Sequence, residues 1–194
     1  MVNDQLIYGL RPILQAVQDG QTIDKVFLQK GISGALYTQL EGTLRDAGIE
    51  PKYVPVEKLN RVTRGNHQGA VAYLSPIDFH DLEEVIMKVI EAGRKPLILA
   101  LDRITDVRNF GAIARTADCS GVDAIVIPKN DSAPVSADAV RTSTGALLEV
   151  PVCKVNHMKD AVYLAQSLDL KIITGTEKSE TPMYDAPFNE PCMV

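Results

Sequence analysis

The sequence comprises 194 residues, 45% of them hydrophobic and 23% charged, with a formal net charge of −5 at neutral pH. This length suits one large domain or two small ones, and the composition is ordinary for a globular protein. The negative net charge argues against a nonspecific nucleic-acid coat, and no stretch approaches the roughly 20 apolar residues that span a bilayer, so no membrane partner is expected.

The N-terminus and the cysteines indicate the cellular compartment. MVNDQLIYGL has no basic region followed by an apolar run, so we expect no secretory signal. Cys119, Cys153 and Cys192 are scattered, odd in number and without CxxC spacing. Such cysteines are typical of structural thiols in a reduced, cytoplasmic protein without a metal site. We expect Cys119 in particular to be buried and unreactive.

The charge is unevenly distributed along the chain. Residues 1–76 contain eight Lys and Arg against seven Asp and Glu, a net charge of +1, whereas residues 77–194 contain twelve against eighteen, a net charge of −6. Because salt screens charges beyond about 10 Å, an acidic protein can still bind RNA through a local basic patch.

The first part of the chain predicts a compact α/β domain over residues 1–76. Helical spacing of apolar residues covers 8–20 and 33–48, and a further short helix follows the extended segment KYVPV. Two strands are predicted at 24–30 and 69–75. The proline and helix-capping residues that follow predict a linker over 77–81.

The second part, residues 82–194, predicts a parallel sheet. After a helix over 82–93, four runs of apolar residues alternate with three helical stretches. The runs are 96–102, 123–128, 150–155 and 170–175, and the helices are 110–120, 136–147 and 157–168. Strands that are apolar on both faces and separated by helices indicate a doubly wound α/β domain, with its ligand crevice at the carboxyl ends of the strands. The final Cys-Met-Val reads as the beginning of one more strand.

The segment DRITDVRNFGAIARTA, residues 102–117, combines a charged loop with a helix of small residues. Asn109 occupies a predicted N-cap position. Gly111 and Ala112 would let a backbone or a ligand approach the first turn closely. Arg115 is expected about one and a half turns into the helix, reaching back over the loop.

Two interpretations of Arg115 are about equally favoured by composition alone. With Arg108 and the helix N-terminus, it could bind phosphate oxygens through paired hydrogen bonds. Alternatively, it could form an ion pair with Asp102 or Asp106.

Four segments carry a resemblance to a known family. The segment DRITDVRNFGAIARTADCSGVDAIVIP (102–128) resembles the first signature of the SpoU (TrmH) family of RNA ribose 2′-O-methyltransferases, and VRTSTGALLEVPV (140–152) resembles the Ser-x-Gly-Ala segment of that family. Upstream, IYGLRPILQAV and NHQGAVAYLSP resemble its small substrate-binding domain, which is akin to ribosomal protein L30e. The resemblance implies an L30e-like domain followed by a parallel-sheet SPOUT domain of the trefoil-knot type.

The resemblance implies methyl transfer from S-adenosylmethionine to an RNA ribose, with Arg115 as the catalytic arginine and Asn109 beside it. Within the family, it is closest to the bacterial branch that acts on a guanosine of large-subunit ribosomal RNA. A homodimer is implied for the full-length protein. A tRNA substrate, or a module that binds structured RNA without catalysis, are the alternatives.

The resemblance also has a gap. Family members continue into a Gly-x-Glu-x-x-Gly loop, an Ile-Pro-Met strand and a Ser-Leu-Asn helix, which this sequence lacks. Among its own residues, Thr174, Gly175 and Thr176 are expected to contact the cofactor. We therefore expect a family member truncated before the knot, with most of its S-adenosylmethionine pocket missing, that is inactive by itself.

Six cations are candidate RNA contacts. In residues 57–69, Arg61 and Arg64 are spaced to share one helical face, whereas the isolated His67 is expected only to form hydrogen bonds within a loop. A solvated helix end is the alternative interpretation of this cluster. The six candidates are Lys58, Arg61, Arg64, Arg103, Arg108 and Arg141.

Overall fold

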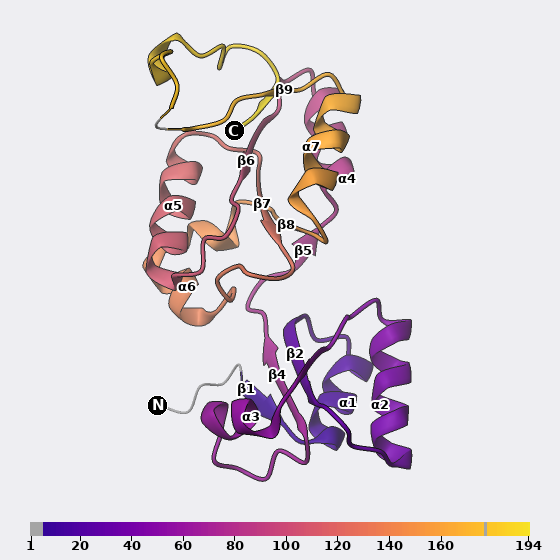
Figure 1. The fold of residues 1–194 in the computed structure, drawn as a ribbon. Helices are drawn as coiled ribbons and strands as arrows, with labels where there is room; N and C mark the ends of the chain where they lie inside the picture. Colours follow the sequence, from indigo (N-terminus) through magenta and orange to yellow (C-terminus); the bar gives the residue numbers. More distant parts are fainter. Residues whose placement is uncertain (1–5, 177) are drawn as a thin grey trace. The chain divides into compact units, whose positions relative to one another are not determined.

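The computed structural model describes residues 6–176 and 178–194 (Figure 1). The chain forms two compact units, the first extending to Pro76 and the second from Ile77 to Val194, with Pro134–Ala137 grouped with the first. Within the described part of the chain, no helix is long and apolar enough to cross a membrane.

The first unit is a mixed four-stranded sheet with helices on both faces. In the sheet order β1-β4-β2-β3, β4 is antiparallel to β1 and β2, and β3 is parallel to β2. The strands are β1 (Leu6–Tyr8), β2 (Ile23–Gln29), β3 (Lys52–Val54) and β4 (Ala70–Leu74). The helices are α1 (Leu10–Gln18), α2 (Ala35–Asp46) and α3 (Val56–Val62).

Alternation along β4 produces the two cores of this unit. Ala70 and Ala72 pack in the same cluster as Ile13 of α1 and Leu40 of α2, whereas Val71 packs in a second cluster with residues of α3 and β3. Successive side chains of a strand point to opposite faces, so an uninterrupted apolar strand serves both layers. The predicted α/β character of this region is confirmed.

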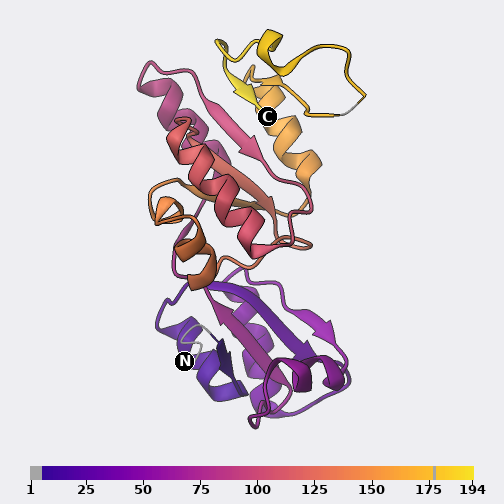
Figure 2. The ribbon, with the colours of Figure 1, turned by 90° about the vertical axis from the view of Figure 1, so that its left-hand side faces the viewer.

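The second unit is a six-stranded sheet in which every pair of neighbouring strands is parallel, in the order β5-β8-β7-β6-β10-β9. Its helices cover both faces, α5 and α6 on one and α4 and α7 on the other (Figures 1 and 2). The strands are β5 (Phe79–His80), β6 (Leu97–Ala100), β7 (Ala124–Pro128), β8 (Val152–Val155), β9 (Lys171–Ile172) and β10 (Cys192–Met193). The helices are α4 (Leu82–Glu91), α5 (Val107–Cys119), α6 (Ala137–Thr142) and α7 (Met158–Ser167), with short 3-10 turns η1 (Ala146–Leu148) and η2 (Met183–Asp185).

The predicted parallel α/β sheet is confirmed, and three details differ. Residues 79–80 of the expected linker form β5 at one edge of the sheet. The helix predicted over 136–147 ends at Thr142, because Thr144 and Gly145 adopt positive φ angles of 57° and 92° that a right-handed helix cannot contain. Strand 170–175 is shortened to β9, whose neighbour β10 has only two residues.

Candidate functional site

Helix α5 carries the residues singled out from the sequence, and its first turn is fixed by Asp106. The Asp106 carboxylate accepts a hydrogen bond of 2.8 Å from the backbone N–H of Asn109, three residues later. Asp106 is therefore the N-cap, and the prediction that Asn109 holds that position is wrong. Both residue types cap helices well, but the helix begins at Val107, which leaves Asn109 exposed in the first turn.

The buried side of α5 is packed closely against α6 at Gly111. A Cβ at this glycine would stand 2.7 Å from the Thr142 Cβ and 3.0 Å from the Ala139 carbonyl oxygen. The close approach predicted for Gly111 is confirmed, and the approaching element is the α6 backbone. Phe110 and Ala114 are also buried, so one face of α5 is fixed and the other is left to solvent.

Arg115 lies further along the helix than the sequence suggested. It comes eight residues after Val107, more than two turns into α5. Helical side chains lean toward the N-terminus, so the Arg115 side chain covers the turn around Ala112. About 12 Å of helix axis therefore separates Arg115 from Val107, where the helix begins.

Arg108 and Arg115 share the exposed face of α5. Seven residues are close to two helical turns, so the two arginines lie above one another, about 10.5 Å apart along the axis, with the small side chain of Ala112 between them. All three residues are exposed. The exposed face of α5 therefore presents two guanidinium groups, separated by a site where only the small side chain of Ala112 projects.

Neither arginine is neutralised by a carboxylate of the described residues. In the part of the chain that the structure describes, the side chains of Arg108 and Arg115 form no ion pair or hydrogen bond. The Asp102 carboxylate instead lies 3.8 Å from Nε of Arg103, and Asp106 caps the helix. The alternative interpretation, in which Arg115 is paired with one of these two acids, is wrong.

Arg103 and Arg141, two other candidate RNA contacts, are partnered but exposed. Arg103 adopts a left-handed backbone conformation, with φ of 56°, in the loop after β6. Arg141 forms an ion pair with Asp138 on α6, and both side chains are largely exposed. Exposed ion pairs contribute at most about 1 kcal/mol, so neither guanidinium is sequestered from a phosphate.

The basic cluster of the first unit is also exposed, although its geometry differs from the prediction. Helix α3 ends at Val62 and Thr63 is extended, so Arg64 lies outside the helix and does not share a helical face with Arg61. Nζ of Lys58 lies 5.0 Å from the centre of the Phe27 ring, as in a cation–π contact.

His67 is a buried loop residue that forms hydrogen bonds through both ring nitrogens, as predicted. Its Nε2 lies 2.9 Å from Oδ1 of Asn60, and its Nδ1 lies 3.0 Å from the backbone nitrogen of Gly69. Because the Gly69 N–H can only donate, Nδ1 must accept, and the imidazole is neutral with its proton on Nε2.

The carboxyl ends of the parallel strands β6, β10 and β9 lie side by side at one end of the second sheet. The Ala100 N–H donates to the Val194 carbonyl oxygen over 2.8 Å, and the Ile173 N–H donates to that of Met193 over 2.8 Å. The expected cofactor contacts at residues 174–176 emerge at this end and are exposed. The uncharged hydroxyl and backbone groups of these residues can form hydrogen bonds with a nucleoside. No atom lies within 4 Å of the Cβ position of Gly175, so a ligand can approach its backbone.

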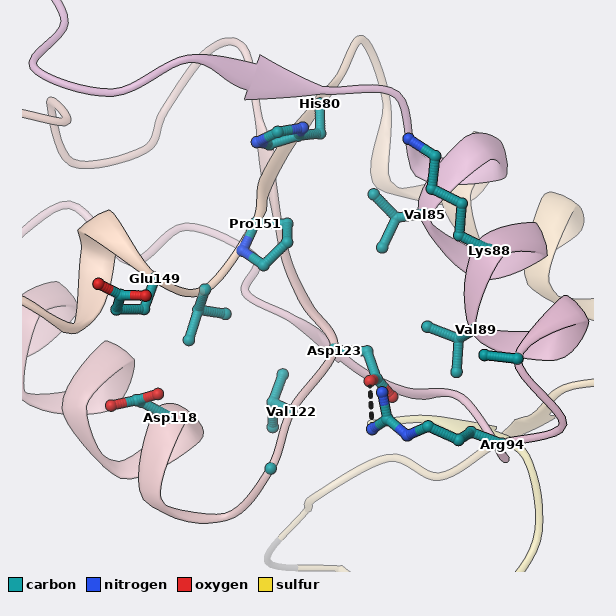
Figure 3. Close-up of a pocket in the computed structure, with 13 residues that line it drawn as sticks. His80, Val85, Lys88, Val89, Arg94, Asp118, Val122, Asp123, Glu149 and Pro151 are labelled. Carbon is teal, nitrogen blue, oxygen red and sulfur yellow. Dashed lines mark ion pairs between the residues drawn. The ribbon is translucent and has the colours of Figure 1, made fainter.

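A pocket of about 560 Å³ lies at the opposite ends of these strands (Figure 3). Asp123 and Pro151, which line it, precede β7 and β8, so the pocket is at the amino ends of the strands. Asp123 pairs with Arg94 over 2.7 Å and also accepts the Leu97 N–H over 2.9 Å. No pattern in the sequence indicated this pocket, and the charges of Arg94 and Asp123 at its centre serve the packing of β6 against β7.

Cys119 is exposed near the end of α5, four residues beyond Arg115. The expectation that it is buried is wrong, because residues four apart on a helix share a face and Arg115 faces solvent. The other two cysteines are buried, and burial raises the pKa of the Cys153 thiol to about 12.

Comparisons with known proteins match both units. The model of the SpoU rRNA Methylase family matches residues 96–194, and the model described as RNA 2′-O ribose methyltransferase substrate binding matches residues 6–80. A Staphylococcus epidermidis protein whose name places it in the TrmH family of tRNA/rRNA methyltransferases is 30% identical over 183 residues, covering 94% of this chain and 73% of that protein. A Staphylococcus aureus protein with the same name is 31% identical over 188 residues, with the same coverage.

The fold is similar to that of the SpoU methyltransferase AviRb from Streptomyces viridochromogenes. Its crystal structure matches with a TM-score of 0.53 and 23% identity, covering 97% of this chain and 70% of that one. A second structure of AviRb, in complex with AdoMet, matches with a TM-score of 0.51 and 22% identity over the same shares of the two chains.

Proposed function

This chain belongs to the SpoU rRNA methylase family, and we propose that its protein transfers the methyl group of S-adenosylmethionine to a ribose 2′-hydroxyl of RNA. The observation that carries the proposal is the exposed face of α5. Arg108 and Arg115 lie there without an acidic partner among the described residues, on the helix that contains the first family signature.

In this proposal the two arginines bind the RNA backbone. A guanidinium can hold two phosphate oxygens through parallel hydrogen bonds, which fixes direction as well as distance. The small side chain of Ala112 leaves space between them for a sugar. The exposed amide of Asn109, in the first turn of α5, adds a hydrogen-bonding group at the end of this face nearer the sheet edge.

Arg115 acts by orientation and charge. A guanidinium stays protonated in proteins and is therefore a poor base. Its positive charge would instead align the 2′-hydroxyl and stabilise the negative charge that develops on its oxygen. The hydroxyl proton then passes to solvent or to a group of the RNA.

When bound, S-adenosylmethionine would supply an electrophilic methyl group, whose bond to the sulfonium sulfur breaks with the electron pair left on sulfur, so that S-adenosylhomocysteine is the leaving group. Among the described residues, Thr174, Gly175 and Thr176 would hold part of it through hydroxyl and backbone hydrogen bonds. Their place beside the carboxyl ends of β6 and β10 supports this assignment, because ligands of open parallel sheets bind at that edge.

In more detail, we propose that the substrate is a guanosine of large-subunit ribosomal RNA. The enzyme is a homodimer and acts in the cytoplasm. The name of the family supports ribosomal RNA, whereas the names of the staphylococcal relatives include tRNA as well. Three cysteines without a disulfide are consistent with a reducing compartment. The homodimer rests on the family resemblance alone.

The test is methyl transfer by the complete gene product that carries this sequence. Tritiated S-adenosylmethionine is supplied with ribosomal RNA and, separately, with total tRNA, and the labelled RNA is hydrolysed in alkali. We expect label in alkali-resistant dinucleotides, because a 2′-O-methyl group blocks cleavage. RNA binding without any transfer would instead favour the alternative of a non-catalytic RNA-binding module.

A further inference from the structure

We infer that the loop Gly65–Gly69 of the first unit is a preformed recognition site for an unpaired RNA nucleotide, in which the amides of Asn66 and Gln68 contact the edge of the base. The inference rests on the proposed RNA function and assigns a role to residues outside α5.

Backbone and side-chain hydrogen bonds hold this loop in one conformation. His67, only 8% exposed, joins the loop to α3 through Asn60 and holds the Gly69 N–H at its other ring nitrogen. The Gly65 N–H donates to Oγ1 of Thr63 over 3.1 Å, and the Gly69 carbonyl accepts from the Gln29 N–H of β2 over 2.8 Å. The Gly69 end of the loop is therefore anchored to β2, and its middle is joined to α3 through His67.

Close packing restricts the loop further. A Cβ at Gly65 would stand 2.5 Å from the Tyr8 ring, and one at Gly69 would stand 2.4 Å from Cδ1 of Ile32. Gln68 has a φ of 50°, which is uncommon for a residue with a side chain. A loop ordered before binding loses little entropy when a ligand arrives, which favours recognition.

The anchored loop presents two amides to solvent. Asn66 and Gln68 are exposed on either side of buried His67, and neither amide has a hydrogen-bond partner among the described residues. Each amide offers one acceptor and two donors, a combination that matches the edges of nucleobases. Carboxylates or hydroxyls would not offer both roles with the same planar geometry.

The charges around the loop indicate which ligand would carry that base. Residues 57–69 contain Lys58, Arg61 and Arg64 against one acidic residue, Glu57, and the three cations are exposed. A polyanion is thereby favoured over a neutral peptide. An unpaired base is the expected ligand, because the major groove of duplex RNA is too deep and narrow for side chains, and base-specific recognition of RNA mostly targets unpaired nucleotides.

The test measures binding of the 194-residue chain to two RNAs, a hairpin with an unpaired loop and a fully paired duplex of equal length, by fluorescence anisotropy at several salt concentrations. The amide variant is Asn66→Ala with Gln68→Gly, since glycine tolerates the positive φ of residue 68. The charge variant is Arg61→Ala with Arg64→Ala. The control is Gln39→Ala, which removes an exposed amide on α2.

The amide variant should lose about 5- to 100-fold in affinity for the hairpin, with unchanged duplex binding and salt dependence, because base contacts carry no counterion release. The charge variant should weaken both complexes and lower the slope of log K against log salt by about 1 per arginine. If the amide variant binds the hairpin with a dissociation constant within twofold of the parent value, the inference about the loop is overturned and the proposed function is not affected. A parent chain that binds neither RNA would count against the proposed function as well.

Discussion

Gly111 of α5 and Ala139 of α6 lie in close contact, such that a Cβ at residue 111 would stand 3.0 Å from the Ala139 carbonyl oxygen. Two further atoms, the Thr142 Cβ of α6 and the backbone nitrogen of Ser143 just after it, are as close or closer. These are backbone and Cβ atoms that cannot swing aside. The contact therefore fixes α5, and with it the direction in which Arg108 and Arg115 point.

Gly111→Ala should destabilise the protein by about 1–3 kcal/mol, because overpacking against the α6 backbone exceeds the helix-propensity gain of up to about 1 kcal/mol. The free energy of unfolding is measured in urea. Gly42→Ala is the matched control, since Gly42 is also helical and has open space around its Cβ position. The Gly42→Ala variant should have a higher free energy of unfolding than the parent. An equal increase for Gly111→Ala would contradict close packing of residue 111 against α6.

Asp123 anchors the amino ends of β6 and β7, and its removal should cost more than that of its partner. Asp123→Ala leaves the Leu97 N–H without its acceptor, a loss of about 1–3 kcal/mol in unfolding free energy. Arg94→Ala should cost less than about 1 kcal/mol, because the arginine side chain is 59% exposed. Asp123→Asn retains an acceptor and should fall between them. Equal losses for Arg94→Ala and Asp123→Ala would mean that the ion pair, and not the backbone contact, is the important interaction.

The three cysteines should differ in reactivity toward a thiol reagent at about pH 8. Cys119 is exposed and should react at once. Burial raises the pKa of Cys153 to about 12, with the charge of Asp81 adding to the effect, and burial also raises the pKa of Cys192. Both thiols stay protonated below those pKa values and should react only after unfolding in urea. Cys119→Ser should abolish the fast phase, and a fast phase that persists in this variant would refute the assignment.

The central strands could be predicted from the sequence, whereas the strand order at the sheet edges could not. Apolar runs between helices identify β6, β7 and β8 because a strand covered on both faces has no polar side. The place of β10 between β6 and β9 depends on two paired residues at positions 192–193, a long-range contact without a local signal. The strand β9 is short for the same reason, because it pairs with β10, which has only two residues.

In the candidate site, the residue types were predictable and their surroundings were not. Asp106 and Asn109 are both good N-caps, and only the backbone decides between them. Arg61 and Arg64 fit a helical spacing, but α3 ends between them, where Thr63 becomes extended. The exposure of Arg115 and Cys119 depends on which face of α5 meets the sheet, and the small residues Gly111 and Ala114 decide that face through packing.

The role of Arg115 is tested most directly by the rate of methyl transfer to RNA for Arg115→Lys in the complete gene product. Arg115 is exposed and has no partner among the described residues, so the melting temperature should be unchanged. Lysine retains the charge but cannot form two parallel hydrogen bonds, so kcat should fall at least about tenfold, and Arg115→Ala should lose about 100-fold or more. Arg45→Lys, which changes an exposed arginine of α2, should transfer methyl groups at the parent rate. Near-parental turnover by Arg115→Lys would contradict an orienting role for its guanidinium.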